Sequence, residues 1–159
     1  MLVNKSIISD IKNIIAHSKD NAIRAVDHQR TLMYWHIGKR IFEEEQQGKE
    51  RADYGKFLTK YISEELEPEY GSGFSKRQIE LFRQFYRTFP NTNTLYSQLS
   101  WSQYKIIIRL ESQDKIDFYI AETVKNNWTV RQFERQVYSS LYERLLLSND
   151  KESVLAVAK

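Results

Sequence analysis

Residues 73–90 read GFSKRQIELFRQFYRTFP, and this stretch decides how the rest of the chain is interpreted. Its large apolar side chains recur three or four positions apart, which is the spacing of one face of an α-helix. Ser75, with Gln78 three residues later, is a helix-starting pattern, because the serine hydroxyl accepts a hydrogen bond from a first-turn amide. Pro90 stops the pattern. The stretch therefore predicts a helix that begins at Ser75 and ends before Pro90.

The face of this helix opposite the aromatic residues is basic. At about 100° per residue its cations fall on one side, together with a single acid, Glu80. Arg and Gln near the start of a helix, with cations along its flanks, are typical of the DNA-reading helix of a helix-turn-helix protein. The alternative is an ordinary solvated basic face. We predict nucleic-acid contacts from Ser75, Lys76, Arg77, Gln78, Arg83 and Arg87.

Two further helices are expected to begin in the same way, at Ser100 and at Thr129, each with Gln three residues later. This pattern accounts for most of the likeness between FSKRQIE at 74–80 and WTVRQFE at 128–134. The capping pattern does not explain Arg77 and Arg131, but the rest of the likeness follows from it, so an internal duplication of the sequence is not required. Secondary nucleic-acid contacts are predicted from Arg131 and Arg135.

Helical spacing continues along nearly the whole chain, which contains five Gly, two Pro and no credible strand. We expect an all-α fold of about seven helices. The polar HSKDN at 17–21 is the expected joint of the N-terminal part. The predicted units are a long helix or helix pair at 1–48, a helical domain at 54–147 and a tail or linker at 148–159. Within the domain, a helix-turn-helix-like unit is expected at 56–90 and a second, three-helix unit at 99–147.

Isoleucines dominate the N-terminal part. Ile7, Ile8, Ile11, Ile14 and Ile15 form one stripe, and apolar residues continue at helical spacing towards residue 41. A stripe of this kind can pair with a second copy of the chain or with a partner helix. A possible homodimer, formed through the N-terminal helices of two copies of the chain, is therefore predicted. A protein-interaction module without nucleic-acid contact is the rival function.

Composition excludes several classes of protein. The chain of 159 residues has no cysteine, which removes disulfides, Cys-zinc sites and thiol nucleophiles. Lys5, Asp10 and Lys12 interrupt any signal peptide, and no apolar run could span a membrane, so a cytoplasmic protein without a membrane partner is expected. Residues 43–69 hold nine acidic and four basic residues, whereas residues 74–144 hold eleven basic and seven acidic ones. The basic C-terminal half permits a DNA partner.

No catalytic or metal site is predicted in these residues, and no cofactor is expected. The histidines, His17, His28 and His36, lack a carboxylate at ligand spacing. Glu43, Glu44 and Glu45 are expected to be solvated helix residues. The chain has no glycine-rich phosphate loop. The tryptophans, Trp35, Trp101 and Trp128, could stack on bases, but each lies beside an apolar stripe or a helix start and is expected in the core.

A string of phrases in fixed order carries a family resemblance. They are MYWHIGKRI (33–41), DYGKFL (53–58), GFSKRQIELFRQFYRTFP (73–90), LSWSQYKIIIRL (99–110), FYIAETVKNNWTVRQFERQV (118–137) and LYERLLLS (141–148). Together they resemble the N-terminal domain of the YhcG family of bacterial proteins. In that family a PD-(D/E)XK-type nuclease domain follows the helical domain. The resemblance therefore implies a DNA-binding or targeting module of a nuclease-type protein, non-catalytic in itself, with a C-terminal nuclease domain in the full-length protein.

Two departures qualify the resemblance. The family's Trp-Ser-His-Tyr has Gln103 in place of the histidine, so any role of that histidine is absent here. The Asp and Glu-x-Lys that a PD-(D/E)XK site places on adjacent strands to hold Mg²⁺ are not found. Residues 73–137 are also similar in order to the DNA-binding region of ParB-type partition proteins. The turn from Glu67 to Phe74, however, is longer than that of a tight helix-turn-helix.

Overall fold

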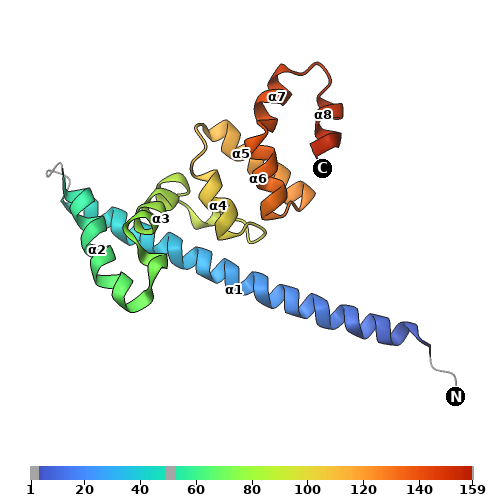
Figure 1. Cartoon of the computed structure of the whole chain (residues 1–159), viewed down its shortest axis with the longest axis horizontal. Helices are drawn as coiled ribbons and strands as arrows, with labels where there is room; N and C mark the ends of the chain where they lie inside the picture. Colours follow the sequence, from blue (N-terminus) through green and yellow to red (C-terminus); the bar gives the residue numbers. More distant parts are fainter. Residues whose placement is uncertain (1–3, 49–52, 159) are drawn as a thin grey trace.

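The computed structural model describes residues 4–48 and 53–158, and its elements in this part of the chain are eight α-helices and two short 3₁₀ turns, with no strand (Figure 1). The all-α prediction is confirmed. The boundary expected between the first two units falls on residues 49–52, outside the described residues. The helices are α1 (Ser6–Gln47), α2 (Tyr54–Tyr70), α3 (Lys76–Thr88), α4 (Trp101–Ile107), α5 (Gln113–Asn126), α6 (Val130–Tyr138), α7 (Leu141–Leu147) and α8 (Lys151–Ala158), with 3₁₀ turns η1 (Ser72–Phe74) and η2 (Thr92–Thr94).

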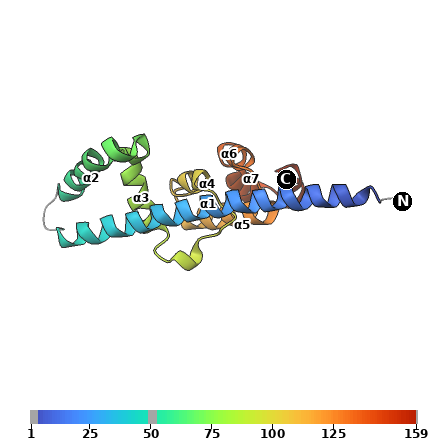
Figure 2. The ribbon, with the colours of Figure 1, turned by 90° about the horizontal axis from the view of Figure 1, so that it is seen from below.

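Helix α1 is one uninterrupted rod of 42 residues. The helix continues through residues 17–21, where the sequence predicted a break. This polar segment contains neither Gly nor Pro, and its side chains are exposed to solvent on the helix, so nothing interrupts the helical backbone. Figures 1 and 2 both show the N-terminal part of α1 extending beyond the other helices. Every residue from 4 to 26 is exposed.

The C-terminal half of α1 packs closely against α3. A Cβ added at Gly38 would lie 1.9 Å from the Phe82 carbonyl oxygen, so the two backbones touch at this crossing. Beside it, Tyr34 stacks on Phe82 with ring centroids 4.4 Å apart, and the Trp35 indole donates to the Phe89 carbonyl. This crossing is the most extensive helix contact of the described residues and fixes the orientation of α3.

Helix α2 reaches α3 through a short connection that contains η1. The helix runs two residues beyond Pro68 and stops at Gly71, whose φ of 93° lies in the left-handed region open to glycine. The Gly71 amide donates to the Glu67 carbonyl at 2.8 Å. Because α3 packs mainly on α1 and less on α2, a helix-turn-helix function of α2 and α3 stays a prediction.

The C-terminal part contains two helices more than expected. The helix predicted from Thr129 is divided by Ser140, whose φ of 59° interrupts the helical backbone, into α6 and α7. The expected tail forms α8 and folds back, since the Gln136 side-chain amide donates to the Ala158 carbonyl at 3.1 Å. Between α5 and α6 the chain turns at Asn127, whose backbone lies in the left-handed region.

Aromatic side chains fill the core between α1, α3 and α4. The three tryptophans are buried, as predicted, with exposures of 4%, 8% and 5% along the chain. Phe85 lies between Trp101 and Tyr104, at centroid distances of 5.1 and 5.0 Å. Burial raises the pKa of Tyr104 to about 12, and its hydroxyl oxygen accepts a hydrogen bond from the Tyr96 amide. This packing holds the N-terminal end of α4 next to α3.

Candidate nucleic-acid interface

The start of α3 has the predicted cap, but in a partial form. Ser75 adopts an extended backbone, and its hydroxyl accepts a hydrogen bond from the Gln78 amide at 3.4 Å. The full reciprocal capping box is present at Ser100 and at Thr129, where the Gln side chain also bonds back to the cap amide. In α3 this return bond is not formed, and the Gln78 side chain instead lines a groove.

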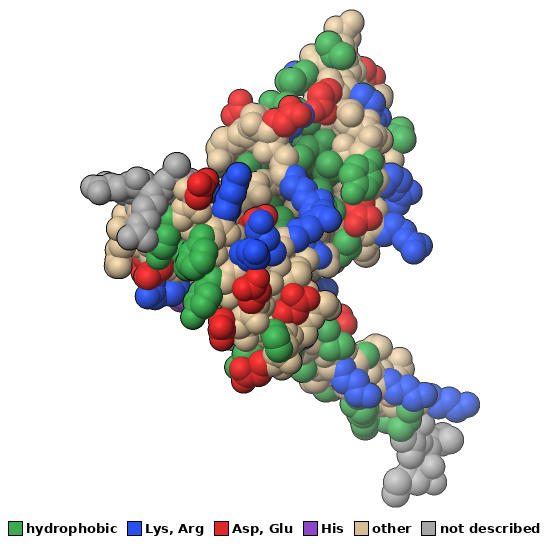
Figure 3. Space-filling view, turned by 60° about the vertical axis from the view of Figure 1, so that its left-hand side comes forward, with side chains coloured by type: hydrophobic (Ala, Val, Ile, Leu, Met, Phe, Trp, Pro, Cys, Tyr) green, Lys and Arg blue, Asp and Glu red, His purple; other side chains and the backbone are tan. Residues whose placement is uncertain are grey.

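This groove lies between α3, α4 and α6 and has a volume of about 380 Å³. We call it the basic groove. Three cations line it, Arg77 from α3 and Lys105 and Arg109 from α4 and the turn that follows, against one acid, Glu134. In Figure 3, Lys and Arg side chains gather over the middle of one face of the body. The remaining lining residues are Gln78, Leu81, Ser102, Ile106, Val130 and Tyr138.

Hydrogen bonds to backbone carbonyls fix the walls of the basic groove. The Gln84 side-chain amide donates to the Ile108 carbonyl at 2.7 Å, which ties α3 to the residue before Arg109. The Gln103 amide donates to the Trp128 carbonyl at 3.0 Å and joins α4 to the start of α6. Because these two bonds link α3, α4 and α6 to one another within the chain, the groove is formed by the packing of the helices themselves.

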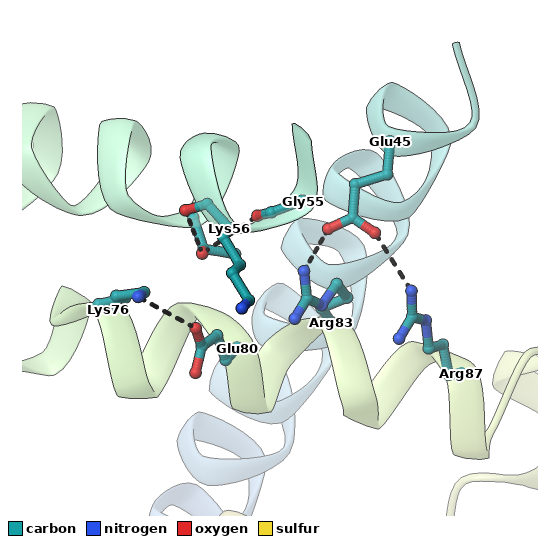
Figure 4. Close-up of polar contacts among 8 residues, drawn as sticks. Glu45, Gly55, Lys56, Lys76, Glu80, Arg83 and Arg87 are labelled. Carbon is teal, nitrogen blue, oxygen red and sulfur yellow. Dashed lines mark hydrogen bonds and ion pairs between the residues drawn. The ribbon is translucent and has the colours of Figure 1, made fainter. Parts of the chain in front are cut away.

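Arg83 and Arg87, two of the predicted phosphate contacts, face α1. Their guanidinium groups both bond to the Glu45 carboxylate, one to each oxygen, with Arg87 at 3.2 Å (Figure 4). The Glu45 side chain is 9% exposed, so it is buried, in contrast to the solvated residue expected from sequence. Arg87 also lies 5.6 Å from the Phe42 ring. One carboxylate therefore neutralises part of the charge that the sequence assigned to nucleic acid.

The other predicted residues do not line the basic groove. Lys76 is half exposed on the side of α3 that also carries Arg83 and Arg87, and its ammonium lies 3.9 Å from the Glu80 carboxylate, a loose pair within one helix turn (Figure 4). Arg131 and Arg135 are exposed on α6, the helix that contributes Glu134 and Tyr138 to the groove. The structure thus brings Arg77 and Gln78 into the groove, turns Arg83 and Arg87 towards α1, and leaves the remaining predicted cations exposed outside the groove.

Sequence reasoning missed three residues of this region. Lys105 and Arg109 are four positions apart, a spacing that places two side chains on one helix face, so the signal was present in the helix predicted to begin at Ser100. Glu45 gave no such signal. It is one of three consecutive glutamates, and only the packing of α3 on α1 buries this one.

Three further groups with shifted pKa values lie away from the basic groove. The Lys115 ammonium bonds to the Glu143 carboxylate, and this bond raises the pKa of Lys115 and lowers that of Glu143. The pair joins α5 to α7. Burial raises the pKa of Tyr119, whose hydroxyl oxygen accepts from the Tyr142 amide at 3.1 Å. These groups stabilise the C-terminal helices and do not reach the groove.

Neither a metal site nor a membrane helix is found in the described part of the chain. Within residues 4–48 and 53–158, no three side chains of His, Cys, Asp or Glu come together as a metal ion would require. Over the same residues, no helix combines the length and the apolar character needed to cross a membrane.

Comparison with known proteins gives two matches. The profile of a family described as the DUF1016 N-terminal domain matches residues 10–144. The protein named "Putative nuclease YhcG" from Escherichia coli (strain K12) is 31% identical over 177 residues, covering 91% of this chain and 47% of its own length. The chain thus spans about half the length of that relative. No solved structure matches. The match over most of its length shows that the chain belongs to the DUF1016 N-terminal domain family, the N-terminal domain of YhcG-type proteins.

Proposed function

We propose that this domain binds DNA through the basic groove and targets a nuclease-type protein to it. The observation that carries the proposal is the convergence of Arg77, Lys105 and Arg109 from separate elements on one preformed groove. Cations concentrated in a hollow attract phosphate more strongly than the same charges spread over a surface. Gln78, released from the cap, adds a donor and an acceptor that suit a base edge.

Exposed residues near the groove extend the proposed interface. Ser75 and Lys76 lie at the same end of α3 as Arg77, and Arg131 and Arg135 are exposed on α6. We assign them contacts to the phosphate backbone, which position a protein without reading sequence. Arg83 and Arg87 are assigned a weaker role, because Glu45 already pairs with both.

The test is a titration of fluorescently labelled duplex DNA with the purified chain at several salt concentrations. We expect the triple variant Arg77→Ala, Lys105→Ala, Arg109→Ala to bind at least about tenfold more weakly. Its log–log dependence on salt should be flatter by about 0.9 for each phosphate contact that is lost. Circular dichroism would confirm that the variant keeps its helices.

The matched control removes three exposed cations from other surfaces, through Arg40→Ala, Lys60→Ala and Lys125→Ala. Both variants lower the net charge equally, so a purely non-specific attraction would weaken in both to the same degree. Equal loss in the two variants, or no binding by the unaltered chain at low salt, would refute the groove as the interface. A single-stranded probe of the same sequence measures the strand preference.

The name of the matched relative supports a nuclease context. We propose that the domain supplies binding while cleavage belongs to a C-terminal PD-(D/E)XK-type domain of the full-length protein. Accordingly, supercoiled plasmid incubated with this chain and Mg²⁺ should stay intact. Cleavage that disappears with chelation of the metal would show that this segment is itself catalytic.

A protein-interaction role is the second candidate, and one specific observation favours it. The N-terminal half of α1 exposes five isoleucines within nine residues, at Ile7, Ile8, Ile11, Ile14 and Ile15. Exposed apolar stripes of this kind mark protein contacts. Homodimerisation through α1 is therefore proposed beside DNA binding, and the two roles are compatible.

A further inference from the structure

The projecting half of α1 carries an apolar surface that nothing in the described chain covers. Its five isoleucines are between 46% and 64% exposed. Helical spacing continues this row through small residues, and no charged side chain interrupts it. We call this row the isoleucine stripe: Ile7, Ile8, Ile11, Ile14, Ile15, Ser18, Ala22 and Ala25.

The isoleucine stripe faces away from the body of the molecule. Counting about 100° per residue, it centres on the side of α1 opposite to the packed residues Thr31, Gly38 and Glu45. Closer to the stripe, Arg24 and Asp27 line a pocket whose other wall comes from residues 97–100 and 127–130, and they too point to the body side. A second helix can therefore lie along the stripe without meeting the rest of its own chain.

We propose that a second copy of this chain occupies the stripe, with the two α1 helices antiparallel and crossing near His17. It rests on the homodimerisation proposed above and adds the direction and register of the pair, and it does not depend on DNA binding. The argument is the distribution of volume along the stripe. Its N-terminal end is built of five isoleucines, whereas its C-terminal end consists of Ser18, Ala22 and Ala25, with the larger Val26 only at its margin.

An antiparallel pair places large side chains opposite small ones. With core positions whose residue numbers add up to about 32, Ile7 faces Ala25 of the second copy and Ile14 faces Ser18. Ile8 then faces Ala22. Facing large and small residues interdigitate at constant helix separation. A parallel pair would set isoleucine against isoleucine at one end and alanine against alanine at the other, so the helices would diverge.

The charged residues beside the stripe leave it free for a second helix. Asp10, Lys12 and Lys19 lie at its edges, where their charged groups reach water. Arg24 points to the body side of α1 and takes no part in the pair.

Sedimentation equilibrium of the full chain, without DNA, tests the association. We expect a monomer–dimer equilibrium and at least about a 100-fold higher dissociation constant for Ile11→Glu, because its carboxylate would be buried in the pair. Ile23→Glu is the matched control, since Ile23 is 68% exposed on the same helix but lies off the stripe. A chain that stays monomeric up to about 100 μM, or an equal effect of both variants, would overturn the proposal. The stripe would then serve a different partner.

Cross-linking tests the direction, because the chain has no native cysteine. In an antiparallel pair Ser18→Cys lies close to its counterpart, and a short bis-maleimide should join the two copies. Ile7→Cys would lie about 27 Å from its counterpart at 1.5 Å per residue and should not be joined. Efficient cross-linking at both positions would show a parallel pair and refute the register.

Discussion

The two halves of α1 share one backbone but differ in what covers them. From Thr31 to Glu45 the helix presents its inward residues to α3, including Trp35 and Gly38. From residue 4 to residue 26 every side chain is exposed, although apolar residues are nearly as frequent there. The apolar face of the first half points away from the direction in which the second half is packed.

This contrast shows what an apolar stripe does and does not specify. Spacing predicts that a helix has a face to bury, in both halves alike. It says nothing about whether the partner is another part of the same chain or another molecule. In α1 that choice depends on α3, which reaches only the second half. Variants of one half of α1, each compared with a control variant elsewhere in the chain, test this contrast. The largest expected loss in the free energy of unfolding comes first.

Gly38→Ala should break the packed half. The new Cβ would lie 1.9 Å from the Phe82 carbonyl oxygen, so α1 and α3 must separate, and we expect a loss of about 3 kcal/mol in the free energy of unfolding. Urea denaturation followed by circular dichroism measures it. Ala16→Val adds more volume in the exposed half and should cost no more than about 0.7 kcal/mol. Similar losses in Gly38→Ala and Ala16→Val would mean that the backbones of α1 and α3 are not in close contact at Gly38.

Trp35→Phe should weaken the same contact by about 2 kcal/mol, because it removes side-chain volume and leaves the Phe89 carbonyl without its donor. Trp128→Phe is the control. Trp128 is equally buried, but within the described residues its indole nitrogen has no hydrogen-bond partner, so only volume is lost. Thermal unfolding should therefore show the larger decrease for Trp35→Phe, and the reverse order would contradict the role of the hydrogen bond.

Glu45→Gln compares two neighbouring glutamates of α1. Glu45 is buried and pairs with Arg83 and Arg87, so we expect its replacement to lower the free energy of unfolding by about 1.5 kcal/mol. Glu44→Gln removes an exposed pair with Arg40, worth no more than about 0.5 kcal/mol. Urea midpoints at low and high salt would separate them, since the exposed pair is screened more strongly. Equal effects of the two variants would mean that the ion pairs of Glu45 with Arg83 and Arg87 do not stabilise the packing of α3 on α1.

Ile14→Ala should have the smallest effect on the isolated chain. Ile14 is 64% exposed, so at protein concentrations too low for association its loss should change the free energy of unfolding by less than about 0.5 kcal/mol. The effect should grow as the concentration rises, because a dimer is stabilised by mass action. A large loss at high dilution would show that the stripe is covered within one chain.

Much of the fold could be predicted from the sequence, because helix starts are local. Ser100 and Thr129 cap their helices with the full capping box, as the Gln three residues after each predicts. The break between α6 and α7 and the helix α8 were not predicted. No glycine or proline marks the break at Ser140 in the sequence. Helix α8 depends on a non-local contact, because its end is bound by the Gln136 side chain of α6.

The candidate site was predictable in part for the same reason. Arg77 and Gln78 follow from the start of α3 and lie in the basic groove. Lys105 and Arg109 belong to a different helix, and only the tertiary packing that Gln84 and Gln103 help to hold brings them to the same place. That Glu45 meets Arg83 across 38 residues could not be inferred from spacing.

The length of α1 sets a distance. A helix of 42 residues measures about 63 Å, and an antiparallel pair crossing near His17 would hold the two Gly38 crossings about 65 Å apart along the rod. Two turns of B-DNA cover about 68 Å. If the proposed pair binds DNA through both basic grooves, as proposed, the rigid helix would fix the distance between the two DNA contacts. Inserting or deleting a turn of α1 would change the preferred spacing without altering either groove.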